Sequence, residues 1–508
     1  MKAPSPPPSR APVNKRSDER KTLLELLAGG GRHIAAALAA LLVYPIIARV
    51  LSVELLGAWA LLSTAGFLLS LSDLGLTTAV HRAAVTQDHA RARRAVGLAL
   101  FSVAGLGPLL AAASYAFLLD LPAIARAAQG SLGEGVGRAA VVVLAAGFVS
   151  ALAGPYRGFA LARGGVAPVA TARALSSMTQ LAVTAVAVVF ERSLLAPAAG
   201  YLAGALVELA LSWKAASAID PAVPRRPTRP TDRAEAIAAL RDGAAALTIG
   251  VAAAVAIRVD VFVLSSFAPL AVVAAYGVAS RAVDVSYLLA KQSTVALMPR
   301  LGDASRREVA VRVGVGGFGG VVAAGMMALG LAGQPLLIAW VGPAAEGPVA
   351  ARALTLLALA AIVQATSEVP ASMLTLSSRT AWASAIPIAL GSAINITISL
   401  LGAPHYGVWA VAGSTLIGNA VTCLILWRRA QRVLGWSVGS VIRTLATPLA
   451  AGGAAAALAG SLYGYSGGRL LPSLGVCAAA VLSGLLVLSF SMWRSGWKSR
   501  ASISIASP

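Results

Sequence analysis

Long apolar segments, separated by short polar gaps, follow one another along almost the whole chain. About fourteen of these segments contain roughly 20 or more residues with few charges, and a helix of that length crosses a ~30 Å hydrocarbon layer. The pattern therefore predicts an all-α, polytopic membrane protein with about 14 transmembrane helices. We place the segments, within a few residues, at 27–51, 54–80, 95–119, 137–162, 166–190, 194–213, 243–267, 271–296, 309–333, 350–376, 381–402, 407–427, 439–463 and 471–493.

Composition and charge place the chain in a membrane and orient it. Of the 508 residues, 58% are hydrophobic and only 12% are charged, and soluble globular chains do not reach the mean hydropathy of +0.79. Lys and Arg gather in every second gap, so that these gaps and the N-terminal tail hold about 28 of them and the alternate gaps about 6. By the positive-inside rule the basic gaps face the cytoplasm. An even number of spans then places both termini there, in a multi-pass protein of the cell inner membrane.

The net charge of +21 follows from this topology. No basic stripe with interleaved aromatic residues accompanies the charge, so we expect no nucleic acid partner. Cys423 and Cys477 lie far apart within apolar segments, and the histidines have no His, Cys or carboxylate neighbour at ligand spacing. The sequence therefore predicts no metal site, no disulfide framework and no cofactor.

The longest cytoplasmic gap divides the chain into two halves of six segments. Segments four and five meet at Arg163 and segments ten and eleven at Arg379, and six spans per half give both copies one orientation, with a pseudo-symmetry axis along the membrane normal. Shared composition is the alternative explanation, because helices rich in Ala, Leu and Gly resemble one another. We expect a disordered cytoplasmic tail at 1–22, a six-helix lobe at 23–213, a cytoplasmic linker at 214–242, a second six-helix lobe at 243–435, an additional helix pair at 436–493 and a cytoplasmic tail at 494–508.

Ionisable residues inside the apolar segments are functional candidates, because a charge within the hydrocarbon layer is costly unless it faces water or a partner. The anions are Asp73, Glu208, Asp260, Asp284 and Glu368. We expect all of these except Glu208 to pair charges or to couple ion flow to transport. The cations, which we expect to bind an anionic substrate, are Arg32, Arg157, Arg173, Arg258, Arg281 and Lys291.

Helical spacing indicates which segments face a polar interior. Arg281, Asp284 and Lys291 share one stripe of the eighth segment, and similar polar stripes follow the second and seventh segments. These three segments are therefore the predicted cavity walls. We expect Asp284 to neutralise Arg281 one turn away. Asp260 has two interpretations, as a salt-bridge partner of Arg258 or Arg281 or as a group that carries a proton during transport.

Depth separates the cations into two groups. With the N-terminus inside, Arg258 and Arg281 lie nearer the middle or outer half of the membrane, and the other four lie toward the cytoplasmic half. An anionic headgroup would load at the cytoplasmic group and meet the second group on its way out. Arginine supplies a rigid fork of donors that fits a pair of phosphate oxygens. The alternative for the cytoplasmic group is that its side chains snorkel to the inner interface.

Several motifs resemble a known family. Residues 44–51 (YPIIARVL), 54–59 (ELLGAW) and 72–76 (SDLGL) are similar to the opening of the polysaccharide transporter family. Residues 258–260 (RVD), 275–279 (AYGVA) and 404–410 (PHYGVWA) are similar to its second half. This family of O-antigen and exopolysaccharide flippases belongs to the multidrug/oligosaccharidyl-lipid/polysaccharide (MOP) exporter superfamily, and the resemblance covers roughly residues 22–435.

The resemblance implies two six-helix lobes around a central cavity and transport by alternating access. The cargo it implies is undecaprenyl-pyrophosphate-linked oligosaccharide, moved to the outer face of the inner membrane for polysaccharide or lipopolysaccharide biosynthesis. Implied partners are the lipid-linked oligosaccharide, membrane lipids, and the polysaccharide polymerase with its chain-length machinery. Such a flippase is not an enzyme and has no catalytic residue.

Other functions remain alternatives. The additional helix pair leaves room for a lipid II (peptidoglycan precursor) flippase. A drug/cation antiporter of the MATE type should carry an excess of buried carboxylates, whereas buried cations slightly outnumber them here. A membrane-embedded glycosyltransferase or polymerase should have a large outer loop with acidic and basic groups, and the predicted outer gaps are short and nearly uncharged.

The topology can be tested by introducing single cysteines. Cysteines placed near Gly130 and Gly342 should react with an impermeant reagent added outside, whereas cysteines near Arg226 and Arg306 should not, because the basic gaps are cytoplasmic. Labelling of the Arg226 loop from outside would overturn the topology.

Overall fold

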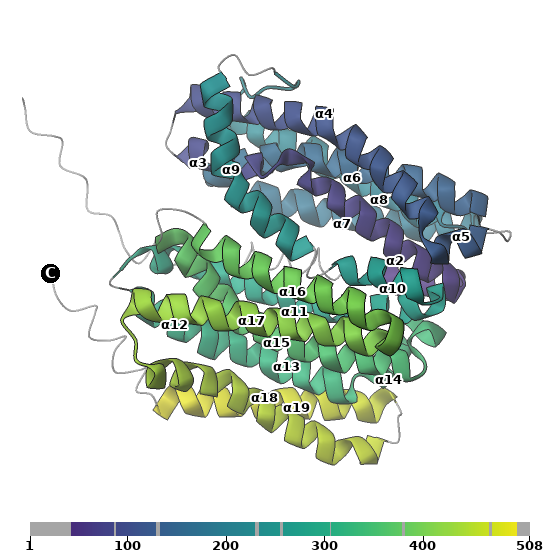
Figure 1. The fold of residues 1–508 in the computed structure, drawn as a ribbon, viewed down its shortest axis with the longest axis vertical. Helices are drawn as coiled ribbons and strands as arrows, with labels where there is room; N and C mark the ends of the chain where they lie inside the picture. The colour runs from purple at the N-terminus through teal and green to yellow at the C-terminus, as the bar shows by residue number, and fades with distance from the viewer. Residues whose placement is uncertain are drawn as a thin grey trace, which may run out of the picture.

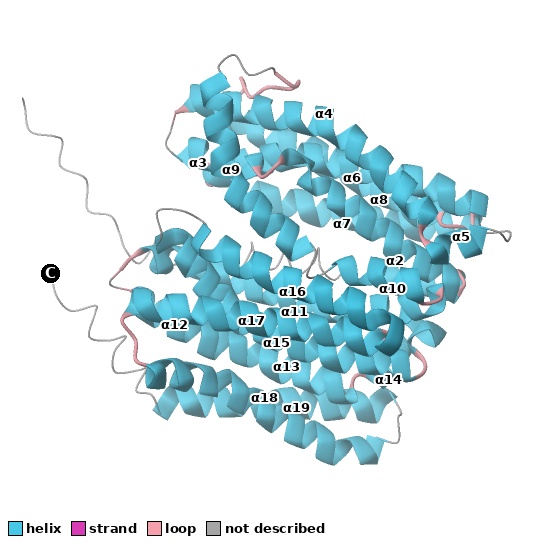
Figure 2. Ribbon diagram, viewed as in Figure 1, coloured by secondary structure: helices cyan, strands magenta, loops and turns pink. Residues whose placement is uncertain are grey.

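The computed structural model describes residues 42–85, 88–128, 133–228, 233–254, 258–304, 306–377, 382–466 and 470–494. All regular structure in these ranges is helical (Figure 2). The predicted all-α membrane fold is thereby confirmed. Arg32 and the tail predicted at 1–22 lie outside the described residues.

Most helices follow the predicted segments, but the segment predicted at 54–80 is interrupted at Leu74 and Gly75, which have positive φ. Residues 42–50 form a helix before α2. The elements are α2 (Val53–Leu68), η1 (Leu69–Asp73), α3 (Leu76–Val85), α4 (His89–Asp120), α5 (Pro122–Ala128), α6 (Gly133–Ala162), α7 (Val166–Phe190), α8 (Leu195–Ile219), α9 (Arg233–Ala254), α10 (Asp260–Phe267), α11 (Leu270–Gly302), α12 (Arg307–Val313), η3 (Gly314–Phe318), α13 (Gly319–Ala332), α14 (Gln334–Val341), η4 (Gly342–Ala345), α15 (Pro348–Ser377), α16 (Trp382–Tyr406), α17 (Val408–Leu434), α18 (Val438–Ser466) and α19 (Leu470–Arg494).

Within the described residues, 11 helices are long and apolar enough to cross a membrane. Two further predicted spans, 271–296 and 471–493, correspond to α11 with 33 residues and α19 with 25 residues. Either helix exceeds the ~30 Å of a hydrocarbon layer in length. The first predicted span, 27–51, lies mostly outside the described residues.

The helices gather into two bundles (Figure 1). In the N-terminal bundle α2, α3, α4, α7 and α8 pack around or beside α6. In the C-terminal bundle α11, α13, α16 and α17 pack around or beside α15, and the pair α18–α19 packs on α13. Of the predicted linker 214–242, α8 takes the first part and α9 the last, because the helical pattern continues into both ends.

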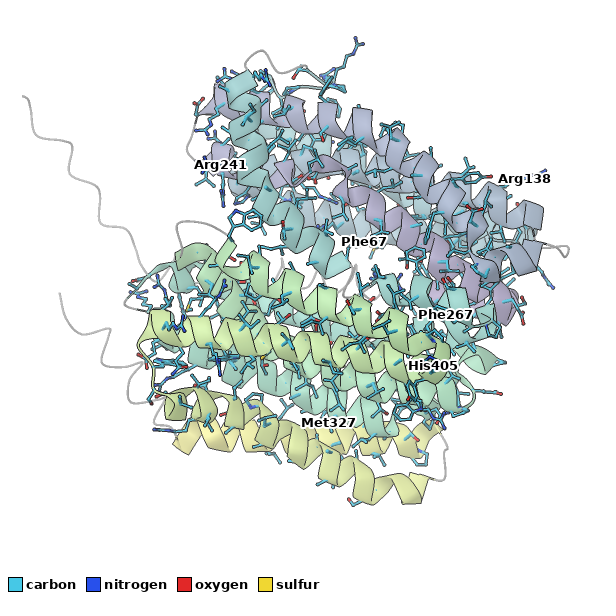
Figure 3. All side chains as sticks on the ribbon, in the orientation of Figure 1. Phe67, Arg138, Arg241, Phe267, Met327 and His405 are labelled. Atoms are coloured by element: carbon cyan, nitrogen blue, oxygen red, sulfur yellow. The ribbon has the colours of Figure 1, made fainter. Side chains whose placement is uncertain are left out.

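The two bundles share a large core at one end, and toward the other end α9 contacts both α3 and α16. We call the end at which α5 and α14 lie the far end. The opposite end, which carries α3, α12 and the start of α4 (Figure 1), is the basic end, because α4 begins with Arg91, Arg93 and Arg94. Arg241 marks the basic end and Arg138 the far end in Figure 3.

At the far end one buried cluster joins Ile47 and Trp59 of the N-terminal bundle to Leu270 and Leu337 of the C-terminal bundle. At the basic end each bundle has its own core. One core is built around Phe159, and the other surrounds Trp427.

Close helix crossings depend on small residues, which let backbones approach in a lipid environment. In the α16–α17 pair, a methyl group on Gly391 would overlap the Thr422 hydroxyl and the Gly418 carbonyl. Such a crossing holds the helices of one bundle together as a rigid unit.

Replacement of Gly391 by Ala should therefore destabilise the C-terminal bundle by about 1–3 kcal/mol, the usual range for overpacking. The measurement is the apparent unfolding temperature of the purified protein in detergent. Gly413→Ala is the matched control, because a methyl group at Gly413 in α17 meets open space. Equal unfolding temperatures for the two variants would show that the crossing tolerates the added volume.

Candidate substrate-binding site

Two arginines share one carboxylate in the C-terminal bundle. Arg258 Nη2 lies 3.0 Å and Arg281 Nη1 lies 3.2 Å from Asp284 Oδ2. All three side chains are mostly buried, with exposed fractions of 15%, 21% and 27%. Asp284 thus lies against Arg281, as its spacing along the helix predicts, and against Arg258 as well. The cluster therefore carries two positive charges against one negative charge.

Arg258 enters this cluster from just before α10. Arg258 and Val259 form a wider helical turn, and α10 begins directly after them at Asp260. The Arg258 guanidinium lies 5.7 Å from the centre of the Phe67 ring on α2, and Figure 3 shows Phe67 between the two bundles. Arg258 thus belongs to the C-terminal bundle but faces the N-terminal one.

Arg281 also reaches across to the N-terminal bundle. Its Nε donates to the Tyr44 hydroxyl at 2.9 Å, and its Nη2 donates to Ser63 Oγ at 3.4 Å. The guanidinium lies 5.5 Å from the centre of the Tyr44 ring. The stripe predicted on the eighth segment therefore does face a polar interior at Arg281 and Asp284. The side chain of Lys291 lies outside the described part of the structure.

A second cluster of the same composition lies in the N-terminal bundle. Glu208 on α8 pairs with Arg157 on α6 and lies 3.9 Å from Arg173 Nε on α7. Ser150 donates to the same carboxylate at 3.4 Å. Glu208 is 12% exposed, Arg157 21% and Arg173 47%. The sequence marks Glu208 as a buried anion but not as a site residue, and only the meeting of three helices reveals its position.

Tyr201 lies between α8 and α2. It is two turns before Glu208 on α8, so both side chains project from one face of the helix. Its ring lies beside Gly66 of α2.

Asp260 has neutral partners and is 3% exposed. Its carboxylate accepts hydrogen bonds from the Tyr276 hydroxyl at 2.5 Å and from Thr415 Oγ1 at 2.7 Å. No described arginine lies within ion-pair distance of it, so the interpretation of Asp260 as a salt-bridge partner of Arg258 or Arg281 is wrong. The reason is geometric, because Arg258 and Asp260 are two residues apart in helical backbone and such residues project from different faces of the helix.

Neutral oxygens continue from Asp260 into α16 and α17. Asn395 accepts from Ser414 at 2.7 Å, and Ser414 lies 2.5 Å from Ser399. A cavity of about 50 Å³ lies beside Asp260 and reaches Asp284 and Gln364, which is room for a few waters at most. Such a carboxylate among hydroxyl and amide oxygens is able to hold a proton or one monovalent cation. The described residues contain no group of three or more metal-ligating side chains.

The remaining predicted anions lie elsewhere. Asp73 accepts from the backbone N–H of Gly75 at 2.9 Å and of Thr77 at 3.2 Å, so it caps the start of α3. Glu368 is half-buried on α15, two residues before Pro370 within the same helix. Neither contributes to the two arginine clusters.

Solved transporter structures share this fold. No protein-family model matches the chain, and no curated protein matches its sequence. A lipid II flippase MurJ in the inward closed conformation aligns with a TM-score of 0.68 and 13% identity, over 95% of this chain and 100% of that one. An inward-facing MATE multidrug transporter of the MOP superfamily gives 0.56 and 17% over 80% and 100%. A mutant of the Vibrio cholerae MATE transporter VcmN gives 0.55 and 16% over 81% and 99%.

The chain shares its fold with these solved transporter structures. It is a multi-pass membrane protein, and the proteins that share its fold are a flippase and MATE transporters.

Because Asp284 is shared by Arg258 and Arg281, we expect a definite order of stability among variants of these three residues. Asp284→Asn alone leaves two buried cations without their counter-charge and should be the least stable, by about 1–3 kcal/mol. Adding Arg281→Gln should restore part of the loss, and adding Arg258→Gln as well should restore more, because each step removes one uncompensated charge. Unfolding temperature in detergent and membrane-inserted protein level are the readouts. If every added substitution lowers stability further, Asp284 is not the structural counter-charge.

Proposed function

We propose that this protein is a flippase that moves an undecaprenyl-pyrophosphate-linked oligosaccharide from the cytoplasmic to the outer face of the inner membrane by alternating access. The observation that carries the proposal is the pair of arginine clusters, each with two cations on one carboxylate. An excess of partly desolvated arginine fits a substrate with adjacent phosphates, because the guanidinium fork binds two phosphate oxygens and stays charged.

The positions of the clusters along their helices suit a path across the membrane. Arg173 is seven residues from the basic end of α7, or about 10 Å along the helix axis. Arg281 is eleven residues from the far end of α11, or about 16 Å. The headgroup would therefore meet the Arg157–Arg173 cluster first and the Arg258–Arg281 cluster second.

The division of the core supports entry from the basic end. The bundles share one large apolar core at the far end, whereas at the basic end their cores are separate and α9 contacts both bundles. With the basic end in the cytoplasm, this is the arrangement expected of a transporter closed toward the outside. Asp260 is then the candidate for coupling, since a buried carboxylate with neutral partners changes its energy most when it gains a proton or cation.

Lipid II translocation is the second candidate function. Among the transporter structures compared, the lipid II flippase aligns over 95% of this chain and the MATE transporters over 80–81%. Lipid II presents the same class of anionic headgroup, so the clusters suit it equally. Complementation separates the two, because only a lipid II flippase should sustain growth of cells depleted of their own. MATE-type export of cations fits less well, since arginines surround Glu208 and Asp284.

Removal of Arg258 or Arg281 should strongly reduce export. In cells that lack their own exporter, Arg258→Ala or Arg281→Ala should reduce surface polysaccharide at least about tenfold, because a hydrogen bond to a charged group contributes about 1.5–3 kcal/mol. Lysine at either position should rescue only partly, since it keeps the charge but lacks the fork.

Arg192→Ala is the control for this experiment, because Arg192 is exposed in the far-end loop between α7 and α8. All variants must be compared at matched levels of membrane-inserted protein. Normal export by both alanine variants would show that these cations have only a structural role.

A further inference from the structure

The far end is closed by direct contact between the bundles. Helix α2 crosses α11 so closely that a methyl group on Gly57 would overlap the Leu270 carbonyl. One helical turn or so deeper, Ala60 of α2 faces Gly277 of α11. Any opening toward this end has to separate α2 from α11.

Arg281 lies just inside this closure and binds both bundles. Its Nη1 contacts Asp284 in its own bundle, its Nη2 donates to Ser63 of α2, and its Nε donates to Tyr44 of the helix at 42–50, which leads directly into α2. All three nitrogens of the guanidinium are therefore engaged. Two of them hold α11 to α2 and to the helix that precedes it.

Tyr44 also contacts α14, a helix of the far end. It is 6% exposed, and its ring centre lies 6.3 Å from that of Trp340 on α14. On the same helix as Tyr44, Arg49 donates to the Ala339 carbonyl of α14 at 3.4 Å. A change at the Tyr44 hydroxyl thus reaches the contact between the helix at 42–50 and α14.

We propose that Tyr44 is a positioning residue that ties anion binding to the closure of the far end. With the site empty, Tyr44 and Ser63 hold Arg281 and keep the bundles together. A pyrophosphate headgroup that binds Arg281 displaces these two hydroxyls, and the far end is then free to open. This inference rests on the proposed function, because it takes the diphosphate as the ligand of Arg281.

Relative bond strengths decide which contacts the headgroup displaces. A phosphate needs two N–H groups of one guanidinium edge to bind in the forked geometry. Hydrogen bonds to a charged acceptor are about twice as strong as those to a neutral one. The Asp284 carboxylate should therefore keep its contact, and the Tyr44 and Ser63 hydroxyls should be lost. The bonds that break are the ones that cross between the bundles.

Accessibility of a buried far-end residue provides the test. Ala345 in η4 belongs to the shared core and is fully buried, and η4 touches both α2 and α11. A cysteine at this position, in a chain with Cys423 and Cys477 replaced by Ala, is reacted with a maleimide in lipid nanodiscs. The probe is undecaprenyl pyrophosphate, and its binding is measured separately.

The parent is the chain that carries only Ala345→Cys and the two cysteine replacements. The parent should react slowly with the maleimide without the probe, and several-fold faster when the probe is bound. Tyr44→Phe keeps the ring but removes the hydroxyl acceptor, so it should react about fivefold faster without the probe and gain little from it. Tyr115→Phe is the matched control, because the Tyr115 hydroxyl lies beside Gly137 within the N-terminal bundle. This control should behave as the parent.

The outcomes separate the two proposals. If Tyr44→Phe reacts as slowly as the parent and responds equally to the probe, the role of Tyr44 is overturned and the proposed function stands. If the parent binds the probe without faster labelling, binding is not coupled to opening and the inference fails alone. If the parent does not bind the probe, the proposed function fails, and the trigger proposed here fails with it.

Discussion

A charged side chain inside a hydrocarbon layer needs an opposite charge or a hydrogen-bond partner within a few ångströms. The rest of this structure depends on which groups supply those partners. Each bundle places one carboxylate between two arginines, Glu208 in the first and Asp284 in the second. The carboxylate lowers the cost of burying the arginines, because each would otherwise lose its hydration without compensation. It also leaves one positive charge in excess. The proposed function assigns this excess positive charge to the binding of an anionic headgroup.

The same arginines connect the interior to the contact between the bundles. Small residues allow α2 and α11 to approach until their backbones touch near Gly57, and this closeness brings Ser63 within reach of Arg281. A looser crossing would separate these groups, because a hydrogen bond weakens steeply with distance. Close packing at the far end and the polar network behind it are therefore interdependent. The separate cores at the basic end impose no such constraint.

Asp260 differs from Glu208 and Asp284 because its partners are neutral groups and not arginines. It has hydroxyl partners in Tyr276 and Thr415 and no arginine within ion-pair distance among the described residues. Hydrogen bonds from neutral groups stabilise a carboxylate less than a guanidinium does. This carboxylate is thus the one whose energy would respond most to a bound proton or cation, whereas Asp284 is already balanced. The two aspartates lie beside one small cavity and have different electrostatic surroundings.

The sequence by itself determined the spans and the kinds of charge that they carry. The segment predicted at 166–190 is α7 with the same bounds, because a helix in lipid satisfies its backbone hydrogen bonds within its own segment and hydropathy therefore defines it locally. The pair Arg281 and Asp284 was also predictable, since both lie on one turn of one helix. Contacts between helices were not. Glu208 pairs with arginines of two other helices, Asp260 binds a residue 155 positions away, and Asp73 caps a turn where the segment had been expected to continue as one helix. Tertiary structure decided these partners because they depend on where helices cross and break, and hydropathy and spacing along one segment do not specify either.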